Sequence, residues 1–148
     1  MSSFEKMISL IIPFYNSEST LPRCLASVEG QSIDKNSIEV ILVNDGSEDG
    51  SDEIAKDFAS RNTFATIITQ PHGGSAAARN SGITAARGKY IAFLDSDDTL
   101  SADALKISFD FLLCHFCVPF VFLLCFLDLG KPHSFQWLEV FFYYHFYN

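Results

Sequence analysis

Basic residues are scarce in this chain: 10 Lys and Arg stand against 18 Asp and Glu, which gives a formal net charge of −8. An acidic chain disfavours nucleic acid as the main partner, because its phosphate backbone is bound mostly by Lys and Arg. A phosphate-bearing ligand is compatible with this charge only where a metal ion or helix N-termini offset the carboxylates. We therefore expect no nucleic-acid partner.

Cysteine and secretory features are also scarce. Only Cys24 of the four cysteines lies in the first hundred residues, so we expect reduced thiols and no disulfide framework. Residues 1–6 are polar, and the apolar run at 7–12 is too short for the core of a signal peptide. These features predict a cytoplasmic protein.

Charge is nearly absent from the last forty positions, which hold ten of the 15 phenylalanines and four charged residues. We therefore divide the chain into residues 1–104 and a hydrophobic, aromatic-rich tail, 105–148. The apolar stretch 111–127 reaches the lower length limit of a membrane span. The tail is interpreted either as a membrane anchor, which would make the protein membrane-associated, or as aberrant translation past an exon or frame boundary.

Four short apolar runs predict the strands of one buried sheet. They lie at residues 8–12, 38–43, 64–69 and 90–94. The first two segments between them have the apolar spacing of helices and the third is alanine-rich, so the order matches the βαβ repeat of a parallel sheet. The sequence predicts a three-layer α/β/α domain over residues 7–103, with Pro13 ending the first strand.

Ligands of parallel α/β sheets bind beside the carboxyl ends of the strands. This rule brings residues 13–18, 44–47 and 95–98 together on one rim of the predicted sheet. Asp45 lies two positions after the second apolar run, beyond Asn44, and we expect it to be exposed on that rim. The rim is therefore the predicted ligand site.

Three carboxylates, Asp95, Asp97 and Asp98, follow the last apolar run. Acids this close repel one another or hold a cation. Hard oxygen ligands select Mg²⁺ or Mn²⁺, which share the rest of their coordination shell with phosphate. One interpretation is thus a metal–diphosphate site, and the other is a solvated acidic turn.

The segment 70–74 is a glycine-containing loop whose backbone, at Gly74 for instance, can approach another group closely. His72 within it is interpreted as an ordinary loop histidine, with a ligand contact as the alternative. Arg79 lies on the alanine-rich helix predicted for residues 75–86, where we expect it behind the acids as a counter-charge.

Four motifs occur in order along these elements. They are IIPFYN at 11–16, VNDGS at 43–47, GSAAARNSG at 74–82 and FLDSDD at 93–98. Together they resemble family 2 glycosyltransferases of the GT-A fold, a Rossmann-like nucleotide-diphospho-sugar transferase fold. The resemblance covers residues 7–103 and corresponds to the nucleotide-sugar-binding half of such an enzyme, so the domain is expected to be truncated.

The resemblance implies a nucleotide-sugar donor, commonly a UDP-sugar. Pro13, Tyr15 and Glu18 match positions that line the nucleoside pocket of the family. Asp45 matches the residue that hydrogen-bonds the uracil ring. The acceptor, whether glycan, lipid or protein, is not indicated.

The resemblance also implies a divalent cation, Mg²⁺ or Mn²⁺. Asp95 and Asp97 match the Asp-x-Asp motif, which holds the ribose and the metal that bridges the diphosphate. Asp98, Gly74 and Arg79 adjoin the matched positions without a defined role.

Two alternatives to an active transferase stay open. No Asp or Glu after residue 104 has a context that suggests a catalytic base, so the chain is alternatively a non-catalytic nucleotide-binding fragment. The acid motif also resembles that of haloacid-dehalogenase phosphatases, in which Asp95 would be the nucleophile and Asp97 the acid/base.

Overall fold

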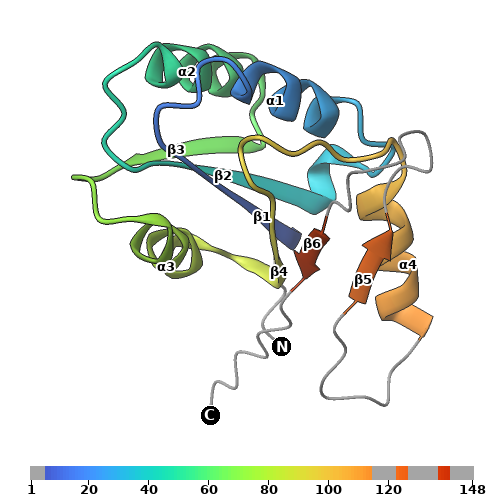
Figure 1. The fold of residues 1–148 in the computed structure, drawn as a ribbon. Coiled ribbons are helices and arrows are strands. Elements are labelled where there is room, and N and C mark those ends of the chain that lie inside the picture. The colour runs from blue at the N-terminus through green and yellow to red at the C-terminus, as the bar shows by residue number, and fades with distance from the viewer. Residues whose placement is uncertain (1–5, 115–122, 127–136, 141–148) are drawn as a thin grey trace.

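The computed structural model describes residues 6–114, 123–126 and 137–140 (Figure 1). The elements in chain order are β1 (Lys6–Phe14), α1 (Leu21–Glu29), the 3₁₀ turn η1 (Lys35–Ser37), β2 (Ile38–Asn44), α2 (Ser51–Arg61), β3 (Ala65–Thr69), α3 (Ser75–Ala85), β4 (Gly88–Phe93), α4 (Ala104–Cys114), β5 (Leu123–Phe126) and β6 (Trp137–Val140). The four predicted strands and the three helices between them are confirmed.

Strands β1 to β4 form one parallel sheet in the order β3-β2-β1-β4. Helices α1 and α2 cover one face and α3 covers the other, which gives the three predicted layers (Figure 1). The strands are apolar on both faces because both are covered. Strands β5 and β6 pair antiparallel as a separate two-stranded sheet.

The core is divided by the sheet into two clusters. The larger joins alternate residues of β1 and β2 to α1, α2 and the first turn of α4. The smaller joins the opposite faces of β1, β2 and β4 to α3. Helix α3 approaches β1 closely because Gly82 has no side chain: a Cβ there would clash with Cγ2 of Ile11.

Pro13 lies within β1 and does not end it, contrary to the sequence prediction. Successive residues of a central parallel strand bond to opposite neighbours: the Phe14 carbonyl accepts from Asp45 N–H on the β2 side, and the Ile11 carbonyl from Leu94 N–H on the β4 side. The position of Pro13 therefore faces β4, which ends one residue before Leu94. Proline has no N–H to donate towards β4, but no strand continues there, so no hydrogen bond of the sheet is lost.

Helix α4 continues the core beyond residue 104. Ala104, Leu105 and Ser108 are buried, and Phe109 packs against the larger cluster. The side chain of the buried Gln31 fixes the start of the helix, because its Oε1 accepts from Leu105 N–H (3.0 Å). The domain boundary at 104 stays a prediction.

The membrane prediction concerned residues 111–127, of which 115–122 and 127 lie outside the described residues. Four positions of that stretch form β5. Among the helices that the structure describes, none is long and apolar enough to cross a bilayer. The interpretation of the rest of the tail lies outside the described residues.

Candidate functional site at the carboxyl ends of the strands

The loops that follow β1, β2 and β4 meet at one rim, as predicted. The backbone N–H of Asp45 donates to the carbonyl of Phe14 (3.0 Å), which joins the ends of β1 and β2. The hydroxyls of Ser17 and Ser96 are 2.8 Å apart, which joins the loop after β1 to the acidic loop after β4. Segments up to 79 residues apart in the chain thus form one surface.

Asp45 is buried on this rim, with 3% of its surface exposed, so the prediction that it is exposed was wrong. Its Oδ1 accepts from Gln70 Nε2 (2.7 Å) and Gly73 N–H (2.9 Å), and its Oδ2 accepts from Gly74 N–H (2.8 Å). The His72 Nδ1 lies 2.9 Å from the same Oδ2. The loop between β3 and α3 covers the carboxylate because its donors converge on it.

These contacts determine the charge of Asp45. Burial tends to raise the pKa of the carboxyl, but the hydrogen bonds from Gly73, Gln70 and Gly74 and the nearby His72 lower it below its usual value overall. Asp45 is therefore ionised and lies against the N-terminus of α3, where a negative charge is stabilised.

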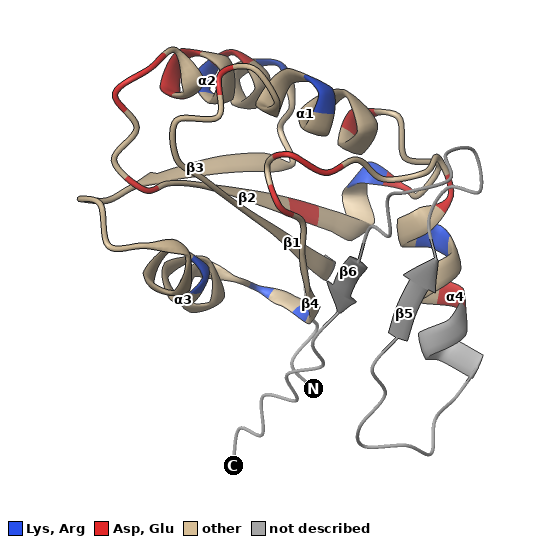
Figure 2. Cartoon of the chain, in the orientation of Figure 1, with Lys and Arg blue, Asp and Glu red and all other residues tan. Residues whose placement is uncertain are grey.

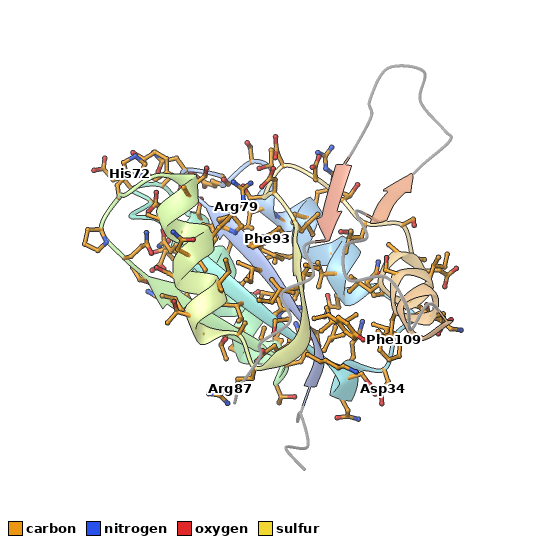
Figure 3. All side chains as sticks on the ribbon, turned by 90° about the horizontal axis from the view of Figure 1, so that it is seen from below. Asp34, His72, Arg79, Arg87, Phe93 and Phe109 are labelled. Carbon is orange, nitrogen blue, oxygen red and sulfur yellow. The ribbon has the colours of Figure 1, made fainter. Side chains whose placement is uncertain are left out.

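Tyr15 and His72 form a stacked aromatic pair beside Asp45. Their ring centroids are 4.1 Å apart, with an interplanar angle of 28°. Tyr15 is 43% exposed, and Figure 3 shows His72 at the end of the molecule away from Arg87. The ordinary-loop interpretation of His72 missed this contact. Its position between a strand end and Gly73–Gly74 was the signal that could have suggested it.

Arg79 lies behind the acidic loop as predicted. Its Nη2 is 2.6 Å from Oδ1 of Asp95, and its guanidinium lies 6.0 Å from the ring centroid of Phe93; Figure 3 shows both side chains on the same side of the sheet. Helix α3 thus supplies a cation to one carboxylate of the acidic loop.

The acidic loop is a tight turn, in which Asp98 N–H donates to the Asp95 carbonyl (3.0 Å). Arg23 on α1 donates to the Asp97 carbonyl (2.9 Å). Among the described residues, no group of three or more His, Cys, Asp and Glu side chains is placed to hold a metal ion. The donors Asp95 and Asp97 fit a Mg²⁺ or Mn²⁺ site that takes the rest of its shell from a diphosphate, because such sites need one or two carboxylates.

Glu18 is directed towards α2. Its Oε2 accepts from Gly50 N–H (3.3 Å), and its own N–H donates to Asp49 (3.0 Å). Pro13 is buried at the end of β1. Of the residues expected to line a nucleoside pocket after β1, Tyr15 is thus the one that presents an exposed ring.

Cys24 supports the acidic loop from α1. Its thiol is fully buried and donates to the Asp95 carbonyl at 3.6 Å. Burial, and then the charges of Asp98, Asp97 and Asp95, raise its pKa to about 12. The thiol therefore stays protonated at neutral pH.

A parallel sheet with helices on both faces and polar loops at its carboxyl edge defines a Rossmann-like α/β domain. The chain belongs to glycosyl transferase family 2, whose model matches residues 9–114. This range includes Asp95 and Asp97, so the segment that carries them matches a glycosyltransferase model. It also extends beyond residue 103, into α4.

Proteins of similar sequence and structure support the assignment to this family. The chain is 47% identical over 96 residues to the uncharacterized glycosyltransferase EpsJ of Bacillus subtilis, with 65% of this chain and 27% of EpsJ covered. Staphylococcus aureus TarS 1–349 in complex with UDP-GlcNAc has a TM-score of 0.70 and 30% identity, covering 74% of this chain and 32% of TarS 1–349. The chain thus spans about a quarter of the length of EpsJ.

A more distant structure has the same fold. The mannosyltransferase PcManGT of Pyrobaculum calidifontis, in complex with GDP-Man and Mn²⁺, has a TM-score of 0.61 and 23% identity, covering 64% of this chain and 28% of the other.

Proposed function

We propose that this domain binds the nucleotide and the diphosphate of a UDP-sugar, as the donor half of a metal-dependent transfer of the sugar to an acceptor. The observation that carries the proposal is the convergence on one rim of the exposed ring of Tyr15, the ionised Asp45 and the Asp95–Asp97 pair. The UDP-GlcNAc bound by the similar TarS supports a uridine nucleotide.

Each part of the rim has a role in the proposal. Tyr15 stacks on the base and Asp45 accepts its N–H, while Pro13, near the end of β1, and Glu18, in the loop after it, shape the pocket. Gly74, just before α3, shapes the pocket because its backbone N–H donates a hydrogen bond to Asp45.

At the other end of the rim, Asp95 contacts the ribose, and Asp95 and Asp97 hold Mg²⁺ or Mn²⁺. Arg79 fixes the orientation of the Asp95 carboxylate through the 2.6 Å ion pair. The metal, when bound, neutralises charge on the leaving diphosphate.

Binding without transfer is the second candidate. Transfer needs a base that deprotonates the acceptor hydroxyl. Asp103, a carboxylate that follows the acidic loop, is instead bonded to the Ser32 hydroxyl (2.6 Å) and lies on the α4 side of the domain. No residue of this chain is proposed as the catalytic base, and the chemical class of the acceptor is left open between glycan, lipid and protein.

Calorimetry with UDP and Mn²⁺ tests the metal site. Asp97→Asn should abolish metal-dependent UDP binding, because a neutral amide oxygen replaces one of very few charged ligands. Without metal its melting temperature should be unchanged or slightly raised, since repulsion among the acids is relieved. Equal metal dependence in the wild type and Asp97→Asn would refute the assignment of the acidic loop.

Two further variants serve as controls. Asp110→Asn removes an exposed carboxylate of α4 and should leave binding unchanged. Asp98→Asn measures whether the third acid shares the cation. A transfer assay with radiolabelled UDP-sugars separates the two candidates: UDP binding without transfer favours the second.

A further inference from the structure

We propose that the imidazole of His72 occupies the place of the nucleobase in the ligand-free domain, and that it must rotate away before a uridine nucleotide binds. His72 then acts as a positioning residue that competes with the base for Asp45 and Tyr15. This inference rests on the proposed function of the rim.

The first argument is the likeness between the contacts of His72 and those of a pyrimidine. The imidazole stacks on Tyr15 at a centroid distance of 4.1 Å. Its Nδ1 lies 2.9 Å from Oδ2 and 3.1 Å from the backbone carbonyl of Asp45. Both neighbours are acceptors, so Nδ1 carries the hydrogen. A uracil ring offers the same combination of a flat π face and a ring N–H donor.

The second argument is that the Asp45 carboxylate already has four donors around it. A carboxylate has about four lone-pair positions, so a base that donates to Asp45 must displace one of these donors. Two of them are the amides of Gly73 and Gly74 at the start of α3. The third, Gln70, is fixed at its other end, because its Oε1 accepts from the Ser81 hydroxyl (2.5 Å).

His72 is the donor that can leave most easily. Its side chain is 55% exposed, so water replaces its hydrogen bond when it turns outward. Displacing a backbone amide would instead move the main chain at Gly73 and Gly74, which leads directly into α3, and displacing Gln70 would also disturb its bond with Ser81. The exchange therefore takes place at His72.

The backbone of the loop stays in place during this exchange. Gly46 has a φ of +75°, and a Cβ there would lie 2.8 Å from the backbone N of His72, which shows how closely the two turns pack. The N–H of Gln70 donates to the Asn44 carbonyl (3.0 Å). The movement is thus a rotation of one side chain, without opening of the loop.

When His72 occupies the base position, the apparent affinity for UDP is the intrinsic affinity multiplied by the fraction of molecules in which that position is free. His72→Ala empties the position in every molecule. It should therefore tighten binding of UDP, in the presence of Mn²⁺, by about three- to tenfold. Uridine should gain by the same factor, because it has the same base.

Calorimetry on the full chain, in the wild type and in His72→Ala, provides the test, with pyrophosphate and Mn²⁺ as the matched ligand control. Pyrophosphate has no base, so its affinity should be the same in both proteins. His72→Phe keeps a flat ring on Tyr15 but has no donor for Asp45. Its affinity for UDP should lie between the other two.

The outcomes are distinguishable. If wild-type protein binds UDP and His72→Ala binds it equally or more weakly, the competition proposed for His72 is refuted while the proposed function stands. If His72→Ala tightens pyrophosphate as much as UDP, the effect does not arise at the base position, and the inference is again refuted. If neither protein binds UDP with Mn²⁺, the proposed function fails and this inference fails with it.

Discussion

The carboxylate of Asp45 joins the end of β2 to the start of α3, and its lowered pKa makes the stability of the domain depend on pH. A lowered pKa in the folded state stabilises the fold at pH values above the usual pKa of aspartate, about 3.9. That contribution is lost as the pH falls through the lowered pKa. Asp49 and Asp52 also have lowered pKa values, so Asp45 accounts for part of the effect.

Asp45→Asn should reduce the free energy of unfolding at pH 7 by about 1–3 kcal/mol, because charge-assisted hydrogen bonds to two backbone amides are weakened. The difference from wild type should shrink as the pH falls below about 4. Urea denaturation at pH 7 and at pH 3 measures both effects. Asp110→Asn is the control. If the free energy of unfolding differs between Asp45→Asn and wild type by the same amount at pH 7 and pH 3, the lowered pKa of Asp45 is contradicted.

The sequence placed Asp45, Asp95 and Asp97 on the same rim, because each lies within three residues of the end of an apolar run and the carboxyl ends of parallel strands share one edge. It did not predict the burial of Asp45. The donors that cover it come from the Gln70–Gly74 loop, 25 to 29 residues later in the chain, and no local pattern reports a contact between two loops.

At the scale of elements, the position of α3 depends on a glycine. Gly82→Ala should bring a Cβ into Ile11 of β1, and overpacking of this kind costs about 1–3 kcal/mol. Alanine gains about 1 kcal/mol of helix propensity over glycine, so we expect a net loss of up to about 2 kcal/mol. Thermal and urea unfolding measure it.

Thr84→Ala is the matched control, since Thr84 is an exposed position of the same helix. It should gain a few tenths of a kcal/mol from propensity alone. A Gly82→Ala protein more stable than wild type would mean that α3 does not pack on β1 as closely as described.

The strands, α1 and α2 could be predicted because their apolar patterns are undisturbed by other signals, and α3 because alanine favours helix. Pro13 and α4 could not be predicted in the same way. A proline ends a strand only where its N–H would have bonded, which depends on how far β4 extends. The apolar spacing of α4, with Leu105 and Phe109 four residues apart, was obscured by the aromatic residues that follow.

At the scale of the whole molecule, charge is unevenly distributed. The segment 70–94 contains no Asp or Glu but includes Arg79, Arg87 and Lys89. Carboxylates gather on the loops that follow β2 and β4 (Figure 2). A diphosphate therefore approaches an edge of like charge unless a cation is present.

Without divalent ions, UDP should bind several-fold more tightly at about 0.1 M salt than at about 0.01 M. The Debye length falls from about 30 to about 10 Å between these concentrations, which screens repulsion by the acidic loops. Equilibrium binding at the two concentrations measures the effect. Uridine has no phosphate and should show none, whereas UDP binding that weakens with salt would mean that Arg79 dominates the field at the rim.

The reactivity of the buried Cys24 thiol can report on the position of the acidic loop, because the thiol donates to the Asp95 carbonyl. A thiol with a pKa of about 12 reacts with alkylating reagents only after it becomes exposed and its thiolate can form. Exposure requires the backbone at Asp95, which accepts its hydrogen bond, to separate from α1. The alkylation rate of Cys24, followed by peptide mass spectrometry, therefore measures how often this edge of the site opens in the unmodified protein. A metal–nucleotide complex that holds Asp95 should slow that rate.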